Sequence, residues 1–509
     1  MMSLKRMFRR SVVCTGMTSA LWAGTARAQQ KTNPSPLLDS SGYVREDAYL
    51  SNASPLSAAD QKYGSIKGLP IKKLAGEVVN ISLKSRDDGN KYWGRITGTP
   101  YEKMTAEWAE SKFHQFGLTD IHEQEFPLQP QWFPLDWSVA ASGGGKTLAF
   151  KTLTPALGAP STPDGGLEAE AVWVGLGTPA DFLGRDVHGK VVVVQSMLQP
   201  GNVGHSAAWE GALKRAADGG AAAVIGIWGY DGNLSVWQSM GGGLANPTFT
   251  IPGFWMGWED GKTLRDLIGT GQPVKITMQL KTEMRQGLKA SAAFGTLPGM
   301  TDENIIVLAH MDAYFEGALD NASGLATMAT LADYFSRIPK AQRRRNLIFI
   351  ATAGHHSGSP TTTYFHNHRD AVLAKTVLMI NCEHTSYSDF LLWHTVFRQD
   401  NIVQGRRWWV YGSHNLMDIA QSAWHTFGVG LVADMDPNAS GDMGPMERDA
   451  PSIQIIRSPE QKHTDGDTLD IVPAVGLEAA ARAYAKIIDE VNNLGRDQLV
   501  ADTPAAPAK

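Results

Sequence analysis

Cysteine is nearly absent from this chain, which has only Cys14 and Cys382 among its 509 residues. Cys14 lies in a segment that we expect to be removed, so the mature protein keeps Cys382 alone and cannot form an internal disulfide. Its stability therefore has to come from an apolar core. With 43% hydrophobic residues, a chain of this length can build two or more globular domains.

Long apolar runs are also missing, since no stretch reaches the ~20 apolar residues that a membrane-spanning helix needs. We therefore expect no membrane span. The first residues combine basic side chains, a short apolar stretch and the small-residue site Ala26-Arg27-Ala28. This pattern predicts a signal peptide over residues 1–28 and a periplasmic or secreted protein. The pair Arg9-Arg10 fits a twin-arginine signal and an ordinary secretory leader equally well.

An excess of positive charge is absent as well, because the formal net charge is -5 at pH 7. Removal of residues 1–28 takes away five positive charges and no acid, which brings the mature chain to -10. Such an acidic chain is a poor candidate for nucleic-acid binding. We expect a small-molecule or peptide substrate and no nucleic acid as partner. The sequence leaves the oligomeric state open, a homodimer included.

Changes in composition divide the rest of the chain. A segment rich in Ser, Asn, Pro and Gln follows the leader and predicts a poorly ordered arm. Between about residues 130 and 285, short β-rich runs alternate with Gly and Pro, whereas residues 101–116 have the periodicity of an amphipathic helix. We predict an arm over 29–65, a main domain made of 66–130 and 286–495, an inserted β-rich domain over 131–285 and a disordered tail over 496–509.

From Asn304 onward, strand and helix signals alternate. This alternation predicts an α/β fold, with a largely parallel mixed sheet and helices on both of its faces. The arginine run 343–345 is expected to form a solvated turn before one of the strands. The predicted strands are 305–309, 347–351, 376–382 and 452–456, and the predicted helices are 323–336, 364–373 and 475–491.

Side chains that bind metals are concentrated at the ends of these predicted strands. The carboxyl ends of parallel strands lie at one edge of a sheet, so groups that are far apart in sequence can converge there. A single histidine at a strand end is more often a cap or core residue, but recurrence at successive ends favours a zinc site, because zinc prefers imidazole and carboxylate ligands. The candidate residues are His310, Asp312, Asp320, His355, His356, Glu383 and His463.

Two segments, AHMDAYFEGALDNASG (309–324) and HTDGDTLD (463–470), resemble motifs of the co-catalytic zinc aminopeptidases, the M28-type family that includes glutamate carboxypeptidase. The resemblance covers roughly residues 70–495. It implies the zinc aminopeptidase fold for the main domain. It also implies an exported metallohydrolase, aminopeptidase- or carboxypeptidase-like, that cleaves amide bonds of peptide, aminoacyl or N-acyl amino acid substrates with metal-activated water.

The predicted inserted domain has a resemblance of its own. Its runs HGKVVVVQ, KRAADGGAAAVIG and IPGFWMGWEDGKTL are similar to the protease-associated domain that many members of the family carry as an insertion. The resemblance of the main domain implies His310 and Glu383 on one zinc ion, His463 on the other and Asp320 bridging both. Asp312 would orient the site from behind His310.

The chain departs from the family at one pair of residues. Where many members have two adjacent glutamates, the general base and a metal ligand, this chain has His355-His356. The resemblance then implies that His356 is the ligand and His355 the base, since a neutral imidazole can do both. With one carboxylate fewer, two zinc ions and a hydroxide keep one uncompensated positive charge, which weakens the second ion or eases ionisation of the water. The expected cofactor is zinc, as one or two ions.

The double histidine leaves several alternatives open. The same scaffold holds a single zinc in the related glutaminyl cyclases. In the transferrin receptor it forms a binding protein that has no catalytic activity. An imidazole whose pKa is lowered by metal charge is a poorer acid, which favours a non-peptide ester or amide as substrate. A Ser-His-Asp hydrolase is disfavoured, because no G-x-S-x-G elbow follows a strand.

Overall fold

The computed structural model describes residues 56–197, 211–230, 232–240, 250–393 and 396–500. The predicted signal peptide (1–28), most of the predicted arm (29–65) and the end of the predicted tail (496–509) lie outside these ranges. None of the helices within them combines the length and the apolar character that crossing a membrane requires.

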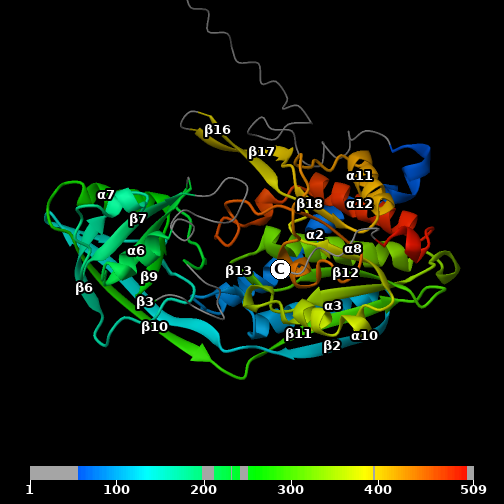
Figure 1. Cartoon of the computed structure of the whole chain (residues 1–509), viewed down its shortest axis with the longest axis horizontal. Helices are drawn as coiled ribbons and strands as arrows, with labels where there is room; N and C mark the ends of the chain where they lie inside the picture. The colour runs from blue at the N-terminus through cyan, green and yellow to red at the C-terminus, as the bar shows by residue number, and fades with distance from the viewer. Residues whose placement is uncertain (1–55, 198–210, 231, 241–249, 394–395, 501–509) are drawn as a thin grey trace, which may run out of the picture.

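The larger part of the protein is built on a seven-stranded mixed sheet (Figure 1). Its four central strands are parallel to one another, and the three outer strands are antiparallel to their neighbours. In spatial order the strands are β18 (Arg407–Tyr411), β19 (Ser452–Ile456), β15 (Thr376–Cys382), β12 (Asn304–His310), β14 (Asn346–Thr352), β11 (Lys289–Leu297) and β2 (Thr119–Pro127).

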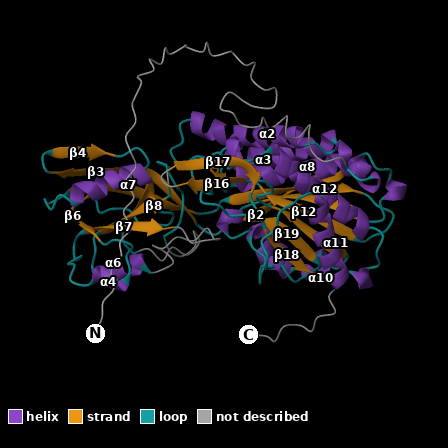
Figure 2. Cartoon of the chain, turned by 90° about the horizontal axis from the view of Figure 1, so that it is seen from above, coloured by secondary structure: helices purple, strands orange, loops and turns teal. Residues whose placement is uncertain are grey.

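Helices flank this sheet, and several of them pack together over it (Figure 2). Helix α8 lies against the central strands, and α2 and α12 pack on α8. The helices of this part are α2 (Gly68–Asp87), α3 (Pro100–Gln115), α8 (Ser323–Ser336), α9 (Pro360–Asn367), α10 (Arg369–Val372), α11 (His414–Thr426) and α12 (Ala474–Val491).

A second body of structure, which we call the β-rich unit, lies between β2 and β11 in the sequence and beside the first sheet in space (Figure 1). It has its own eight-stranded sheet and its own buried apolar cluster. Its strands in spatial order are β4 (Lys146–Ala149), β3 (Gln131–Gly143), β10 (Lys275–Arg285), β6 (Leu167–Trp173), β7 (Val191–Met197), β8 (Ala223–Gly229), β9 (Gly253–Met256) and β5 (Thr154–Pro155), and its helices are α4 (Pro179–Phe182), α6 (Ala212–Asp218) and α7 (Trp258–Ile268).

Short elements complete the fold. Two antiparallel pairs stand apart from the large sheets, and several single turns of helix connect the strands. The pairs are β1 (Gly94–Arg95) with β13 (Ala313–Tyr314), and β16 (Ser388–Trp393) with β17 (Val396–Val403), and the turns are η1 (Ala58–Ser65), η2 (Ala318–Ala322), η3 (Lys340–Gln342), η4 (His355–Ser357), η5 (Gly441–Met446), η6 (Leu469–Ile471) and η7 (Arg496–Gln498).

The predicted fold class is confirmed, because alternating strands and helices do form a mixed sheet flanked by helices. Each predicted strand after residue 304 agrees with an observed one to within a residue or two. The helix predicted over 364–373 is instead two shorter helices, α9 and α10. The apolar periodicity was sufficient for these elements because the central strands are buried almost without interruption.

The prediction of a solvated turn at residues 343–345 is wrong for two of the three arginines. Arg343 is 7% exposed and Arg345 is fully buried, whereas Arg344 is exposed. The Arg345 guanidinium donates hydrogen bonds to the carbonyl oxygens of Val491 (2.5 Å) and Leu494 (2.8 Å). Val491 is the last residue of α12 and Leu494 lies just beyond it, so Arg345 caps the end of that helix. Its guanidinium also pairs with Glu303 Oε2 at 2.9 Å.

Replacing Arg345 with leucine should therefore lower the free energy of unfolding by about 3 kcal/mol, because Glu303 and the Leu494 carbonyl lose their partner and the Val491 carbonyl keeps only the Leu494 N–H. Arg344→Leu is the matched control and should change that free energy by less than ~0.5 kcal/mol. Urea denaturation followed by circular dichroism measures both. Equal effects of the two substitutions would contradict the assigned role of Arg345.

Candidate metal centre

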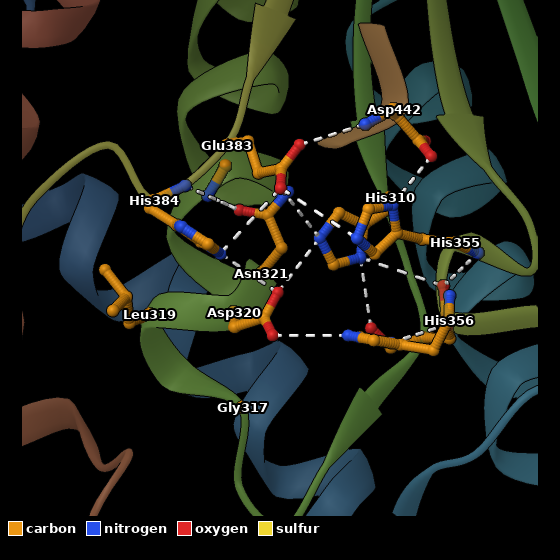
Figure 3. A network of polar contacts seen from close by, with 12 residues as sticks. His310, Gly317, Leu319, Asp320, Asn321, His355, His356, Glu383, His384 and Asp442 are labelled. Carbon is orange, nitrogen blue, oxygen red and sulfur yellow. Dashed lines mark hydrogen bonds and ion pairs between the residues drawn. The ribbon is translucent and has the colours of Figure 1, made fainter. Parts of the chain in front are cut away.

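The carboxyl ends of the central strands bring several candidate residues to one place. His310 is the last residue of β12, His355 and His356 follow β14 in the turn η4, and Glu383 directly follows β15. These three strands are parallel neighbours, so their ends meet at one edge of the sheet. Figure 3 shows Asp320 and Glu383 facing His310 and His356 across a small space.

The Asp320 carboxylate is the centre of this cluster. Asp320 lies in the turn η2, where Asp467 accepts hydrogen bonds from its backbone N–H (3.1 Å) and from that of Leu319 (2.7 Å). Both carboxylate oxygens then face imidazole nitrogens. Oδ1 lies 3.0 Å from His310 Nε2 and 3.1 Å from His384 Nε2, and Oδ2 lies 3.0 Å from His463 Nε2 and 3.3 Å from His356 Nε2.

One carboxylate oxygen of Glu383 accepts hydrogen bonds, and the other has no hydrogen-bond partner among the described residues. Its Oε2 accepts hydrogen bonds from Asn381 Nδ2 (2.9 Å) and from the backbone N–H of Asp442 (3.2 Å). Its Oε1 lies 3.9 Å from His310 Nε2. A side chain at Gly441 would place its Cβ 1.9 Å from Glu383 Oε2, and the φ of +64° there also favours glycine.

Four imidazole rings of the cluster are held from behind through Nδ1. A histidine that ligates a metal through Nε2 usually donates its other N–H to a fixed acceptor, which sets the tautomer and the ring orientation. Such acceptors are the Asp312 carbonyl for His310 (3.1 Å), Asp442 Oδ1 for His355 (2.9 Å), Asp312 Oδ2 for His356 (2.8 Å) and Gln238 Oε1 for His463 (2.9 Å).

The converging atoms fit a metal ion better than they fit one another. His310 Nε2, Asp320 Oδ2 and Glu383 Oε1 are buried and have no hydrogen-bond partner of acceptable geometry in the described part of the chain. Buried polar atoms without partners are rare in native proteins. Three sets of side chains could each hold one ion: His310 with Glu383 and His384, Asp320 with His356 and His463, and His310 with Asp312 and His356.

Burial and neighbouring charges shift the pKa values of the cluster. Burial alone would raise the pKa of Asp320, but Lys462 and His356 hold it well below its usual value. At Glu383, burial would likewise raise the pKa, but His355 and His310 lower it to about 2. Burial and Lys462 lower the pKa of His463 to about 3. These shifts favour ionised carboxylates and a neutral His463, the states that bind metals. Against the effect of burial, Asp312 and Asp320 raise the pKa of His310 and of His356.

All seven residues singled out in the sequence lie in or directly behind this cluster. Asp312 was expected behind His310, but its carboxylate accepts hydrogen bonds from His356 and lies 3.7 Å from His310 Nδ1. The sequence interpretation missed His384, Asp442, Lys462 and Gln238. Only His384 had a signal, because it belongs to the same strand-end run as Glu383.

Solved structures with a similar fold are zinc aminopeptidases and related peptidases. The zinc aminopeptidase from Bacillus subtilis is 19% identical with a TM-score of 0.61, over 86% of this chain and 98% of that one. An aminopeptidase from Aneurinibacillus sp. strain AM-1 is 19% identical with a TM-score of 0.54, over 84% and 95%. A peptidase M28 precursor from Shewanella amazonensis SB2B is 16% identical with a TM-score of 0.63, over 87% and 100%.

No curated protein matches the chain. The model of peptidase family M28 matches residues 293–488, which run from β11 to α12 and include the seven residues singled out in the sequence. The resemblance seen in the sequence is thereby confirmed, and with it the metallohydrolase class: residues 293–488 match peptidase family M28.

Proposed function

We propose that this protein is an exported zinc-dependent hydrolase of amide bonds in peptides, aminoacyl compounds or N-acyl amino acids. The observation that carries the proposal is the convergence of buried imidazole and carboxylate atoms that lack hydrogen-bond partners of their own. The family match supports the reaction class. The proposed export rests on residues 1–28, whose basic start and cleavage site have the pattern of a signal peptide.

Zinc would be held as one or two ions around the shared carboxylate of Asp320. His310 and Glu383 are the proposed ligands on one side of it, and His356 and His463 on the other. Bound zinc supplies a Lewis acid that activates water and polarises the substrate carbonyl. Asp312 positions His356, because it accepts hydrogen bonds from both the Nδ1 and the backbone N–H of that residue.

His355 is the proposed general base. Its Nδ1–H donates to Asp442 Oδ1 at 2.9 Å, which leaves the lone pair of Nε2 free. That nitrogen lies 4.0 Å from Glu383 Oε1, and the ring stacks on His310 with 4.1 Å between ring centroids. The side chain is 13% exposed, so water can reach it. His355 would take the proton of the attacking water and pass it to the leaving amine.

A cavity of about 10 Å³ lies beside His356. A cavity of this size has room for about one water molecule, so a substrate side chain does not fit into it. The cavity is lined by Tyr92, Ile96, Thr97, Gln131, Trp132, Phe133, Asp312, Ala313, Tyr314, His356 and Ser357.

The zinc content of full-length protein purified without chelator tests the proposed centre. Wild type should hold one or two ions per chain, and His310→Ala and His356→Ala should each hold fewer, because each loses an imidazole ligand. His366→Ala is the control, since His366 pairs with Asp449 away from the cluster, and its zinc content should equal that of wild type. Wild type without zinc would contradict the proposal and favour a binding protein without catalysis.

Replacing His355 tests the proposed base separately from the ligands. His355→Ala should lower kcat for hydrolysis of an aminoacyl p-nitroanilide by about 10²–10⁴-fold, the usual contribution of a positioned general base. Its zinc content should stay at the wild-type value, since His355 is not among the proposed ligands. Steady-state kinetics and elemental analysis of the same samples measure both quantities. Unchanged kcat would remove His355 from the mechanism, and lost zinc would make it a ligand instead.

A further inference from the structure

One segment of the β-rich unit reaches the proposed metal centre. Residues 235–238 run antiparallel to residues 463–465, with a bridge between Val236 and Thr464. The Trp237 N–H donates to the His463 carbonyl at 2.9 Å, and the Asp465 N–H donates to the Ser235 carbonyl at 3.1 Å. The loop that carries His463 is thus paired with a strand-like segment from the other body of the structure.

The β-rich unit holds its side of this contact firmly. The Gln238 carbonyl accepts hydrogen bonds from Trp255 Nε1 (2.8 Å) and from the Leu157 N–H (3.1 Å). The Trp237 ring is fully buried and lies 4.6 Å from the Tyr92 ring and 5.6 Å from the Trp137 ring. An apolar cluster with residues from both bodies therefore fixes the segment.

The side chain of Gln238 contacts His463, which is one of the proposed metal ligands. Its Oε1 lies 2.9 Å from His463 Nδ1, so this nitrogen donates its hydrogen and Nε2 keeps its lone pair toward Asp320. Among the four anchored histidines of the described cluster, His463 alone takes its acceptor from the β-rich unit. His463 also has a φ of +63°, a conformation that needs support from its surroundings.

We propose that the β-rich unit supports the metal centre through Gln238, which acts as a positioning residue for His463. This inference rests on the proposed function, because it concerns the zinc ion held by Asp320, His356 and His463. The hydrogen bond fixes the tautomer and the direction of the His463 ring, so docking of the β-rich unit and binding of that ion stabilise each other. By thermodynamic linkage, the factor by which the contact raises zinc affinity equals the factor by which bound zinc stabilises the contact between the β-rich unit and the His463 loop.

The test is zinc affinity, measured by competition with a chromophoric chelator on the full chain. Gln238→Met keeps the length of the side chain but removes the acceptor, and it should weaken binding of the ion held by Asp320, His356 and His463 by about 10–100-fold. Gln238→Glu keeps an acceptor oxygen and should bind zinc at least as tightly as wild type. Gln279→Ala, at an exposed position of β10, is the control and should leave the affinity unchanged.

Hydrogen exchange at the Trp237 amide is a second readout that does not depend on activity. Zinc should slow this exchange in wild type and in Gln238→Glu, and should slow it less in Gln238→Met. If wild type binds zinc and Gln238→Met binds it equally tightly, the inference is wrong and the proposed function stands. If wild type binds no zinc, both are wrong.

Discussion

The Asp320 carboxylate is the constraint on which the rest of the site depends. It is a buried negative charge, 2% exposed, and a buried charge is tolerated only when partners surround it. Imidazole nitrogens face each of its oxygens, and Lys462 Nζ lies 3.7 Å from Oδ2. The turn that carries Asp320 is held by Asp467 and by Arg95, whose guanidinium donates to the carbonyls of Met311 and Gly317. Sheet edge, turn and loops all converge to keep this one group in place.

Much of the fold and the first layer of the site could be predicted from the sequence, because both follow from one regularity. Strands β12, β14 and β15 are apolar runs that end in polar groups, and parallel strands end at the same edge. That rule places His310, His356 and Glu383 together without any knowledge of side-chain geometry. The same apolar runs also predicted the main strands and helices after residue 304, but not β16, β17, β18 and α11.

The residues that were missed depend on geometry that no local pattern contains. His384 directly follows Glu383, and neighbouring residues in extended chain point to opposite sides. Its φ of +51° turns it back toward Asp320. Asp442 comes from a short turn without periodicity, and Gln238 lies 225 residues from His463. Arg345 was misjudged because its partners are Glu303, 42 residues away, and two backbone carbonyls at and just beyond the end of α12, and no local sequence pattern shows these contacts.

The structure also changes the charge balance that the double histidine implies. Counting only Asp320 and Glu383 leaves two zinc ions and a hydroxide with an excess positive charge. Asp442 behind His355 is a carboxylate that this count leaves out, and Asp312, which the resemblance also assigns to the site, lies behind His356. Charges at this distance still act strongly in a buried site, where screening is weak.

Lys462 is the exception to this compensation. Its ammonium lies 3.7 Å from Asp320 Oδ2, the same oxygen that faces His356 and His463. A zinc ion on that side would have to share the oxygen with a second cation, whereas an ion beside Oδ1 would meet no such competitor among the described residues. The two halves of the proposed centre are therefore unequal, and an ion between His356 and His463 would depend most on support from outside the cluster.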